Sequence, residues 1–265
     1  MRHPGSSFSR VGRRALRQVP AVFTDFDGTL TIGGALRSST LQALERAAGS
    51  GLPLVIVTGR PAGYGELMAR TLPVMGVIAE NGGMWFRRKG KRIVRGYAEP
   101  GSVRGANRRR LERAIAGILE EFPGAALSSD CAYTEVDMAI DHAEDRRLPT
   151  ATVDRIEAAC HRRGLHAVGS NVHINCWVGD FDKLSTSRRF ARAVLGLSRA
   201  QLDRSIYLGD SINDAPMFGG FPLSIGVGNV KDVWAELPEK PAYVVEAREG
   251  RGAEEVLNAL IVARS

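Results

Sequence analysis

Short runs of apolar residues recur along the chain, and each is followed by polar residues. The runs over residues 21–23, 54–57 and 77–79 are continuous rather than alternating, which is typical of strands buried on both faces of a sheet. Between the first two runs, leucine and alanine recur at helical spacing over residues 38–48. Strand, helix and strand in this order predict a parallel sheet with right-handed crossovers.

The apolar pattern changes at Met84, where alternation with polar residues replaces the continuous runs. Alternation predicts strands with one polar face, and a Lys-Gly pair between two such strands predicts a hairpin. The expected elements are a hairpin over residues 85–94, helices over about residues 104–122 and from Pro149 onward, and strands over residues 132–140 and 172–178. We therefore expect residues 84–179 to form an inserted α+β domain.

The first pattern resumes after residue 180. The expected elements are a helix over about residues 182–195, strands over residues 205–208, 223–225 and 243–245, and a closing helix over about residues 252–263. The predicted fold class is α/β, with a Rossmann-like doubly wound parallel-sheet core and an inserted α+β cap. The predicted organisation is a basic flexible tail over residues 1–18, a catalytic core over residues 19–83 and 180–265, and a cap over residues 84–179.

Composition places few further limits on the chain. A length of 265 residues with 44% hydrophobic and 25% charged residues is typical of a globular protein with one large or two smaller domains. No apolar run approaches the roughly 20 residues of a membrane helix. The three cysteines lack the Cys-x-x-Cys spacing of a thiolate metal site and are odd in number. They fit a reducing compartment, and a cytoplasmic location is expected.

The net charge of +7 is unevenly distributed. Residues 1–18 hold five arginines and no acid, and residues 87–110 hold ten lysines or arginines and one acid. The rest of the chain is therefore acidic, and a nucleic-acid partner is not favoured. We interpret residues 1–18 as a solvated arm, with an organellar address or a nucleic-acid arm as alternatives. The 87–110 cluster is read as a solvated face or as a surface that steers an anionic substrate.

Polar side chains gather where separate apolar strands end. They are Asp25 with Asp27, Thr58, the segment around Lys183, and Asp210 with Asp214. In a parallel sheet, strand ends on one side converge on one crevice. Two neighbouring carboxylates need either a hard metal ion or a shared proton between them. Carboxylate oxygens suit Mg²⁺, while a lysine and a hydroxyl suit the oxygens of a transferring phosphoryl group.

The segment Asp25-Phe-Asp27-Gly-Thr29 resembles the first motif of the haloacid dehalogenase-like (HAD) phosphatases. Thr58 matches their second motif, Lys183 the third, and Gly209-Asp210-x-x-Asn213-Asp214 the fourth. The insertion between the second and third motifs is similar to that of the sugar-phosphatase branch. This branch includes sucrose-phosphate, mannosyl-3-phosphoglycerate and trehalose-phosphate phosphatases and the phosphomannomutases.

The resemblance implies a role for each motif residue. Asp25 is the expected nucleophile and Asp27 the general acid/base, while Thr58 and Lys183 hold phosphoryl oxygens. The implied cofactor is Mg²⁺, with a metal site made by Asp25, Asp27, Asp210, Asn213 and Asp214. The implied phosphate- or substrate-binding residues are Gly28 and Thr29, through their backbone N–H groups, and Gly59, Arg60 and Asn81.

In the expected cap, Asn171, His173 and Asn175 share one strand face. This face is either solvated or closed over the crevice, where it would hydrogen-bond substrate hydroxyls. The function we expect is a Mg²⁺-dependent phosphatase that hydrolyses a phosphomonoester of a sugar or small polyol through an aspartyl-phosphate. The alternatives are a phosphomutase or phosphotransferase of the same fold, or a phosphosugar- or nucleic-acid-binding module without catalysis. The expected partner is a small phosphorylated molecule, with no membrane; no oligomeric state is predicted.

Overall fold

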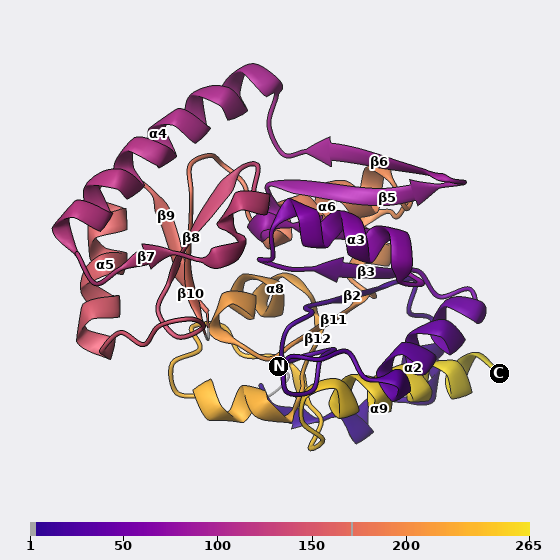
Figure 1. Cartoon of the computed structure of the whole chain (residues 1–265). Coiled ribbons are helices and arrows are strands. Elements are labelled where there is room, and N and C mark those ends of the chain that lie inside the picture. Colours follow the sequence, from indigo (N-terminus) through magenta and orange to yellow (C-terminus); the bar gives the residue numbers. More distant parts are fainter. Residues whose placement is uncertain (1–3, 171) are drawn as a thin grey trace.

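The computed structural model describes residues 4–170 and 172–265, and within these residues the strands form two sheets (Figure 1). The large sheet has the order β1-β13-β12-β11-β2-β3-β4-β5-β6, and the small sheet has the order β7-β8-β10-β9. The strands of the large sheet are β1 (Ser6–Ser7), β2 (Val22–Thr24), β3 (Leu54–Val57), β4 (Gly76–Ala79), β5 (Met84–Lys89), β6 (Arg92–Tyr97), β11 (Ile206–Gly209), β12 (Leu223–Gly226) and β13 (Tyr243–Val244). Those of the small sheet are β7 (Ala126–Leu127), β8 (Asp137–Asp141), β9 (His166–Gly169) and β10 (His173–Trp177).

Helices cover both faces of the large sheet. They are α1 (Arg13–Arg17), α2 (Ser38–Gly49), α3 (Ala62–Thr71) and α9 (Glu249–Arg264) on one face, and α6 (Lys183–Ala193), α7 (Arg199–Leu202) and α8 (Ala215–Gly220) on the other. Alternate residues of one strand pack in different cores: Val22 lies in the first and Phe23 in the second. Both core faces are apolar, which explains the continuous apolar runs. The predicted α/β Rossmann-like fold is confirmed.

The central strands run parallel, and this brings the site together. Strand β2 pairs in parallel with β11 on one side and with β3 on the other. In this register Phe23 faces Tyr207 and Val55 across the two ladders. The segments that follow these three strands therefore begin at neighbouring points along one edge of the sheet.

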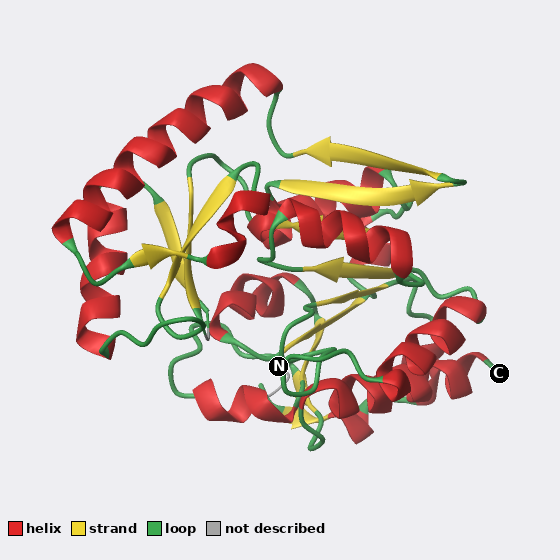
Figure 2. Cartoon of the chain, viewed as in Figure 1, coloured by secondary structure: helices red, strands yellow, loops and turns green. Residues whose placement is uncertain are grey.

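The small sheet packs one face on α4 (Gly101–Glu121) and α5 (Thr150–Arg162), which lie on its outer side (Figure 2). Met138 and Ile174 belong to this apolar core. Their neighbours in the alternation, Ala139 and Asn175, line a cavity on the opposite face, toward the large sheet. We expected a solvated face for the 132–140 strand, and for the 172–178 strand we left open whether the polar face is solvated or closed over the crevice. Every residue of β8 and β10 is buried, because the large-sheet unit covers the polar face.

The hairpin lies in the large sheet rather than in the expected cap. Strand β5 pairs antiparallel with β4, with Met84 opposite Ala79, and β6 pairs with β5. Met84 and Phe86 are buried in the core of the large sheet. Alternation predicts a hairpin but does not say which sheet edge it joins; the short connection from β4 sets that choice. The boundary expected at residue 84 therefore falls inside a continuous ladder, and we place the start of the proposed cap after Tyr97.

Residues 4–18 do not form the expected flexible tail. Ser6–Ser7 pairs in parallel with Tyr243–Val244, and the side chains of Phe8 and Leu16 are buried. A side-chain nitrogen of Arg13 donates a hydrogen bond of 3.2 Å to the carbonyl of Val262 in α9. The buried side chains of Phe8 and Leu16 supply the apolar burial that orders this basic stretch. Among the described residues, the helices are too short or too polar to cross a bilayer.

Candidate active site

Three polar residues follow three neighbouring strands of the large sheet. Asp25 comes directly after β2, Thr58 after β3 and Asp210 after β11. Asp25 continues the ladder by donating its backbone N–H to the carbonyl of Leu208, at 2.8 Å. Thr58 continues it by donating its N–H to Ile78, at 2.9 Å. The strand-end convergence expected from the sequence is therefore present.

Lys183 lies at the centre of this group. Its Nζ is 2.9 Å from Oδ1 of Asp25, 3.0 Å from Oδ1 of Asp214 and 3.3 Å from Oδ1 of Asn213. The side chain is only 3% exposed. Burial alone would lower the pKa of Lys183, but the charges of Asp214 and Asp25 outweigh it and raise that pKa. A capping box at Asp182 fixes the first turn of α6 and so positions the ammonium.

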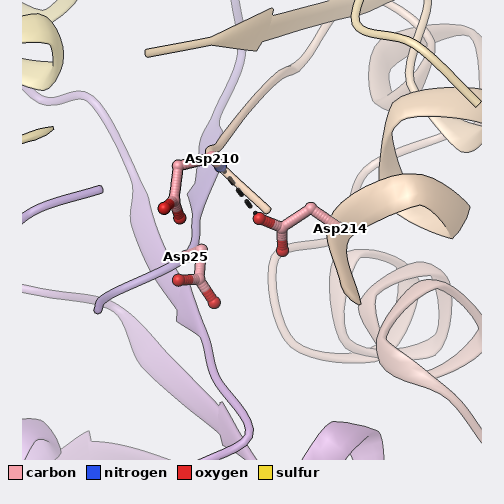
Figure 3. A group of neighbouring side chains, drawn as sticks. All are labelled: Asp25, Asp210 and Asp214. Atoms are coloured by element: carbon pink, nitrogen blue, oxygen red, sulfur yellow. Dashed lines mark hydrogen bonds between the residues drawn. The ribbon is translucent and has the colours of Figure 1, made fainter. Parts of the chain in front are cut away.

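Three carboxylates converge beside this ammonium: Asp25, Asp210 and Asp214 each offer an oxygen, and these oxygens lie within 4.8 Å of one another (Figure 3). Burial, then the like charges of neighbouring aspartates, raise the pKa of Asp210 to about 7. Burial also raises the pKa of Asp25, against the opposing effect of Lys183. Buried carboxylates this close need a cation or protons between them. The donor set is all oxygen and fits a hard divalent cation such as Mg²⁺.

Asp214 is held by four different partners. One oxygen accepts from Lys183 and from the hydroxyl of Tyr207 at 2.5 Å, and the other accepts from the backbone N–H groups of Asp210 (3.0 Å) and Ser211 (3.2 Å). Its side chain is fully buried. Asp214 thus fixes the loop that carries Asp210, and we interpret it as a residue that positions the metal site.

Asp210 is oriented by one residue of the turn after β2 and by one residue that follows β12. The hydroxyl of Thr29 donates to Oδ1 at 3.0 Å, and the amide of Asn229 donates to Oδ2 at 2.8 Å. Gly28 has φ +75°, and a Cβ at this position would lie 2.5 Å from Asp210 Oδ2. Glycine is therefore required here for both conformation and space. The N–H of Gly28 is bonded to Thr31 Oγ1 at 2.9 Å, so its expected donation to a phosphate would need this bond to open.

A cavity lies between the strand ends and the polar face of the small sheet. The predicted site residues among its lining residues are Asp25, Asp27, Thr58, Gly59, Arg60, His173, Asn175 and Asn213. Lys183, Asp210 and Asp214 contact this group by the bonds given above, and Gly28 and Thr29 lie against Asp210. Asn171 falls outside the described residues. Asn81 supports the wall by donating to Asp137 Oδ2 at 3.1 Å.

Residues 22–103 match a family model described as haloacid dehalogenase-like hydrolase. The matched segment includes Asp25, Asp27 and Thr58, which line the cavity. Over this segment the chain resembles the haloacid dehalogenase-like hydrolases. The resemblance inferred from the order of the four motifs is confirmed at this level.

Similar proteins cover nearly the whole of this hydrolase. It is 27% identical to a phosphoglycolate phosphatase of Methanosarcina mazei over 91% of this chain and 96% of the relative. The C-terminal domain of trehalose-6-phosphate phosphatase from C. albicans has a TM-score of 0.71 at 14% identity, over 98% of this chain and 99% of that one. A sucrose-phosphatase from Synechocystis, solved with sucrose and phosphate, has a TM-score of 0.66 at 14% identity, over 92% and 98%. These two structures share the fold of the hydrolase.

Arg60 of the hydrolase is surrounded by carboxylates. It binds both oxygens of Asp27, at 2.9 and 3.0 Å, and also lies 3.5 Å from Asp130 and 3.7 Å from Glu144. Burial alone would lower the pKa of Arg60, but its bond to Asp27 and the nearby charges raise it. We expected Arg60 among the phosphate- or substrate-binding residues; in this structure it links Asp27 to Asp130 and Glu144, two residues of the inserted segment (residues 98–179).

Other residues of the hydrolase site were not found from the sequence. They include Tyr207, Asn229, Glu80, Asp130 and Asp137. Glu80 is fully buried with φ +49°, and its carboxylate accepts the backbone N–H groups of Ala62 and of residues 135–137 at 2.6–2.9 Å. The only available signal was an acid directly after a buried strand. Glu80 thus joins the large-sheet unit to the inserted segment.

Proposed function

We propose that the chain is a Mg²⁺-dependent phosphoric monoester hydrolase that forms an aspartyl-phosphate at Asp25. The observation that carries this proposal is the buried ammonium of Lys183 between Asp25 and Asp214, at 2.9 and 3.0 Å. Its charge favours the carboxylate form of Asp25 against the effect of burial, and its hydrogen bond orients that side chain at the cavity. A charged carboxylate can attack phosphorus, and an ammonium beside it offsets the charge of the phosphoryl group.

In the first step Asp25 attacks phosphorus. Lys183 binds Oδ1 of Asp25, so we assign the attack to Oδ2. A bond forms between Oδ2 and phosphorus, and the bond from phosphorus to the leaving-group oxygen breaks. Asp27 lines the same cavity and gives a proton to the departing oxygen, which leaves as an alcohol. The hydroxyl of Thr58 and the ammonium of Lys183 bind the phosphoryl oxygens during the transfer.

In the second step a water molecule attacks the phosphorus of the aspartyl-phosphate. Asp27, now deprotonated, takes a proton from that water. The bond between phosphorus and Asp25 breaks, inorganic phosphate leaves, and the carboxylate of Asp25 is restored. The ion pair with Arg60 orients Asp27 and favours its carboxylate form, which suits the second step; for the donation in the first step, one of the two bonds to Arg60 has to open so that the oxygen can carry the proton.

The metal would be held by the carboxylates of Asp25 and Asp210 and by the backbone carbonyl of Asp27. Asn213 and Asp214 would support it through their bonds to Lys183 and to the loop that carries Asp210. A bound Mg²⁺ supplies positive charge that offsets the carboxylates and the phosphoryl group. The raised pKa of Asp25 and that of Asp210 fit a site that releases protons when it takes up a cation.

The substrate we propose is a phosphomonoester of a sugar or another small polyol. The names of the similar proteins include both sugar-phosphate and phosphoglycolate phosphatases, so a test must cover both kinds. Phosphate release from such a panel should require Mg²⁺ and stop with EDTA. Asp25→Asn should release no phosphate while keeping the circular dichroism spectrum of the parent. Full activity in EDTA, or in Asp25→Asn, would contradict the proposal.

A further inference from the structure

The cavity wall opposite Asp25 comes from the inserted segment. Its buried polar residues include Asp130, Asp137, His173 and Asn175. If Asp25 receives the phosphoryl group, this wall contacts the rest of the substrate. Its charge and hydrogen-bonding capacity therefore decide which leaving group the cavity accepts.

Asp130 is fixed within this wall. Asp130 is 8% exposed. Its Oδ1 accepts a 2.7 Å hydrogen bond from the hydroxyl of Ser128, and its Oδ2 lies 3.5 Å from a guanidinium nitrogen of Arg60. Asp137 lies close by, and burial, then the charge of Glu80, raise the pKa of Asp137 well above its usual value. Asp130 lines the cavity and forms an ion pair with Arg60, so its carboxylate contributes negative charge to the wall.

The positive charges near this wall are already offset. Arg60 is the one lysine or arginine among the described residues that line the cavity, and it is engaged by Asp27, Asp130 and Glu144. Glu144 also lies 2.7 Å from Nε2 of His173. Arg108 contacts Thr134 and the carbonyl of Asp137 in this wall, and it is paired with Glu112. Among the described residues of this wall, a carboxylate on the substrate would therefore meet no unpaired lysine or arginine and would face Asp130 instead.

Asn175 shows what the wall can bind. Asn175 lines the cavity and is 6% exposed. Its side-chain amide has no hydrogen-bond partner among the described residues. Its Nδ2 points toward Gly59, where a Cβ would lie 3.5 Å from that atom. A planar amide beside carboxyl oxygens can accept from substrate hydroxyls and donate to them.

We propose that Asp130 is a specificity-determining residue that selects an uncharged, hydroxyl-bearing leaving group and rejects one that carries a carboxylate. This inference rests on the proposed function and sharpens it. It predicts that the enzyme prefers polyol phosphates to phosphoglycolate, the substrate in the name of the Methanosarcina mazei relative. Repulsion between two carboxylates in a partly buried site is large enough to decide between such substrates.

The sharpest test compares glycerol 3-phosphate with 3-phosphoglycerate. They share one carbon skeleton and differ in a terminal hydroxymethyl or carboxylate group. The Mg²⁺-loaded enzyme should have a kcat/KM at least tenfold higher for glycerol 3-phosphate. Asp130→Asn removes the charge at nearly constant shape. It should lower the ratio of kcat/KM for glycerol 3-phosphate to kcat/KM for 3-phosphoglycerate by about tenfold. Taking the ratio within each variant cancels any general loss of activity or folded protein.

The matched control is Asp154→Asn, which removes one charge from an exposed position on α5 and should leave the ratio unchanged. A parent enzyme that prefers 3-phosphoglycerate would overturn the inference. The inference would also be overturned if Asp130→Asn and Asp154→Asn had the same ratio of kcat/KM for the two substrates. If neither compound nor p-nitrophenyl phosphate releases phosphate, the proposed function itself is wrong, and this inference falls with it.

Discussion

Arg60 and Asp27, which both line the cavity, form a bidentate ion pair with nitrogen–oxygen distances of 2.9 and 3.0 Å. The paired geometry fixes the carboxylate plane as well as its position. Arg60 also reaches Asp130 and Glu144 in the inserted segment. The same arginine therefore holds the proposed general acid/base and contacts the inserted segment, so the position of Asp27 depends on the position of that segment.

Arg60→Lys should separate this role from phosphate binding. Lysine keeps the charge but cannot bind both oxygens of Asp27. An alkyl phosphate, whose leaving group needs a proton, should lose about 10- to 100-fold in kcat. With p-nitrophenyl phosphate, whose leaving group departs without a proton, the loss should be much smaller. Steady-state kinetics with both substrates makes the comparison, and an equal loss on both would place Arg60 at the phosphoryl group instead.

Lys183→Met should destabilise the protein strongly. It removes the ammonium and leaves the carboxylates of Asp25 and Asp214 buried without a counter-charge. Removing one partner of a buried ion pair costs about 3–5 kcal/mol. The loss should be smaller at pH 5 than at pH 8, because the pKa of Asp25 is already raised by burial and a proton can replace the lysine.

Urea denaturation at the two pH values measures this effect. The matched control is Lys231→Met, whose ammonium pairs with Glu246 at the surface, with the lysine side chain 48% exposed. That pair should contribute less than about 1 kcal/mol. Equal destabilisation by the two substitutions would show that the central ammonium has no special role.

The metal-free protein should become less stable as the pH rises from about 4 to about 7. Burial, then neighbouring charges, raise the pKa of Asp210 to about 7, whereas in an unfolded chain it is near 4. The folded protein therefore binds this proton more tightly, and that contribution is complete below pH 4 and is lost as the pH passes 7. Mg²⁺ should reverse the loss, since it replaces the proton.

The measurement is the shift in Tm that Mg²⁺ produces at pH 5 and at pH 8. The shift should be larger at pH 8, where Mg²⁺ does not compete with protons. Asp210→Asn should abolish most of the difference between the two pH values. Equal Tm shifts at both values in the parent protein would argue against a carboxylate metal site.

Glu80→Gln should loosen the inserted segment. The carboxylate of Glu80 accepts four backbone N–H groups, and the amide of glutamine has one oxygen to offer. The loss should be about 2–4 kcal/mol, since buried donors are left without partners. Hydrogen exchange should accelerate at Val136 and Asp137. Glu66→Gln, which alters more exposed ion pairs with Arg70 and Arg95, is the control and should change neither observable appreciably.

The sequence was informative where one periodic pattern determines the structure. Continuous apolar runs predicted the parallel sheet, and polar residues at the ends of those runs predicted that Asp25, Thr58 and Asp210 would meet. The segment around Lys183 was expected at the same edge of the sheet, and the role of Lys183 at the phosphoryl oxygens followed from the motif resemblance. These features depend on short segments read in order along the chain.

The remainder depends on contacts between distant segments. Arg60 and Asp130 are 70 residues apart, and no local pattern indicates that they meet. Tyr207 was read only as part of a buried strand, although its hydroxyl binds Asp214. The partner of the 85–94 hairpin and the ordering of residues 4–18 depend on which sheet edge is free, which alternation does not reveal.

The central claim is that Asp25 becomes phosphorylated during turnover. The most direct measurement is to mix the Mg²⁺-loaded enzyme with a phosphomonoester that it hydrolyses, quench in acid within one turnover, and locate the phosphoryl group by peptide mass spectrometry. The account predicts a phosphorylated peptide containing Asp25 in the parent protein and none in Asp25→Asn. Turnover with no phosphorylated peptide at any time, or a phosphoryl group on another residue, would contradict it.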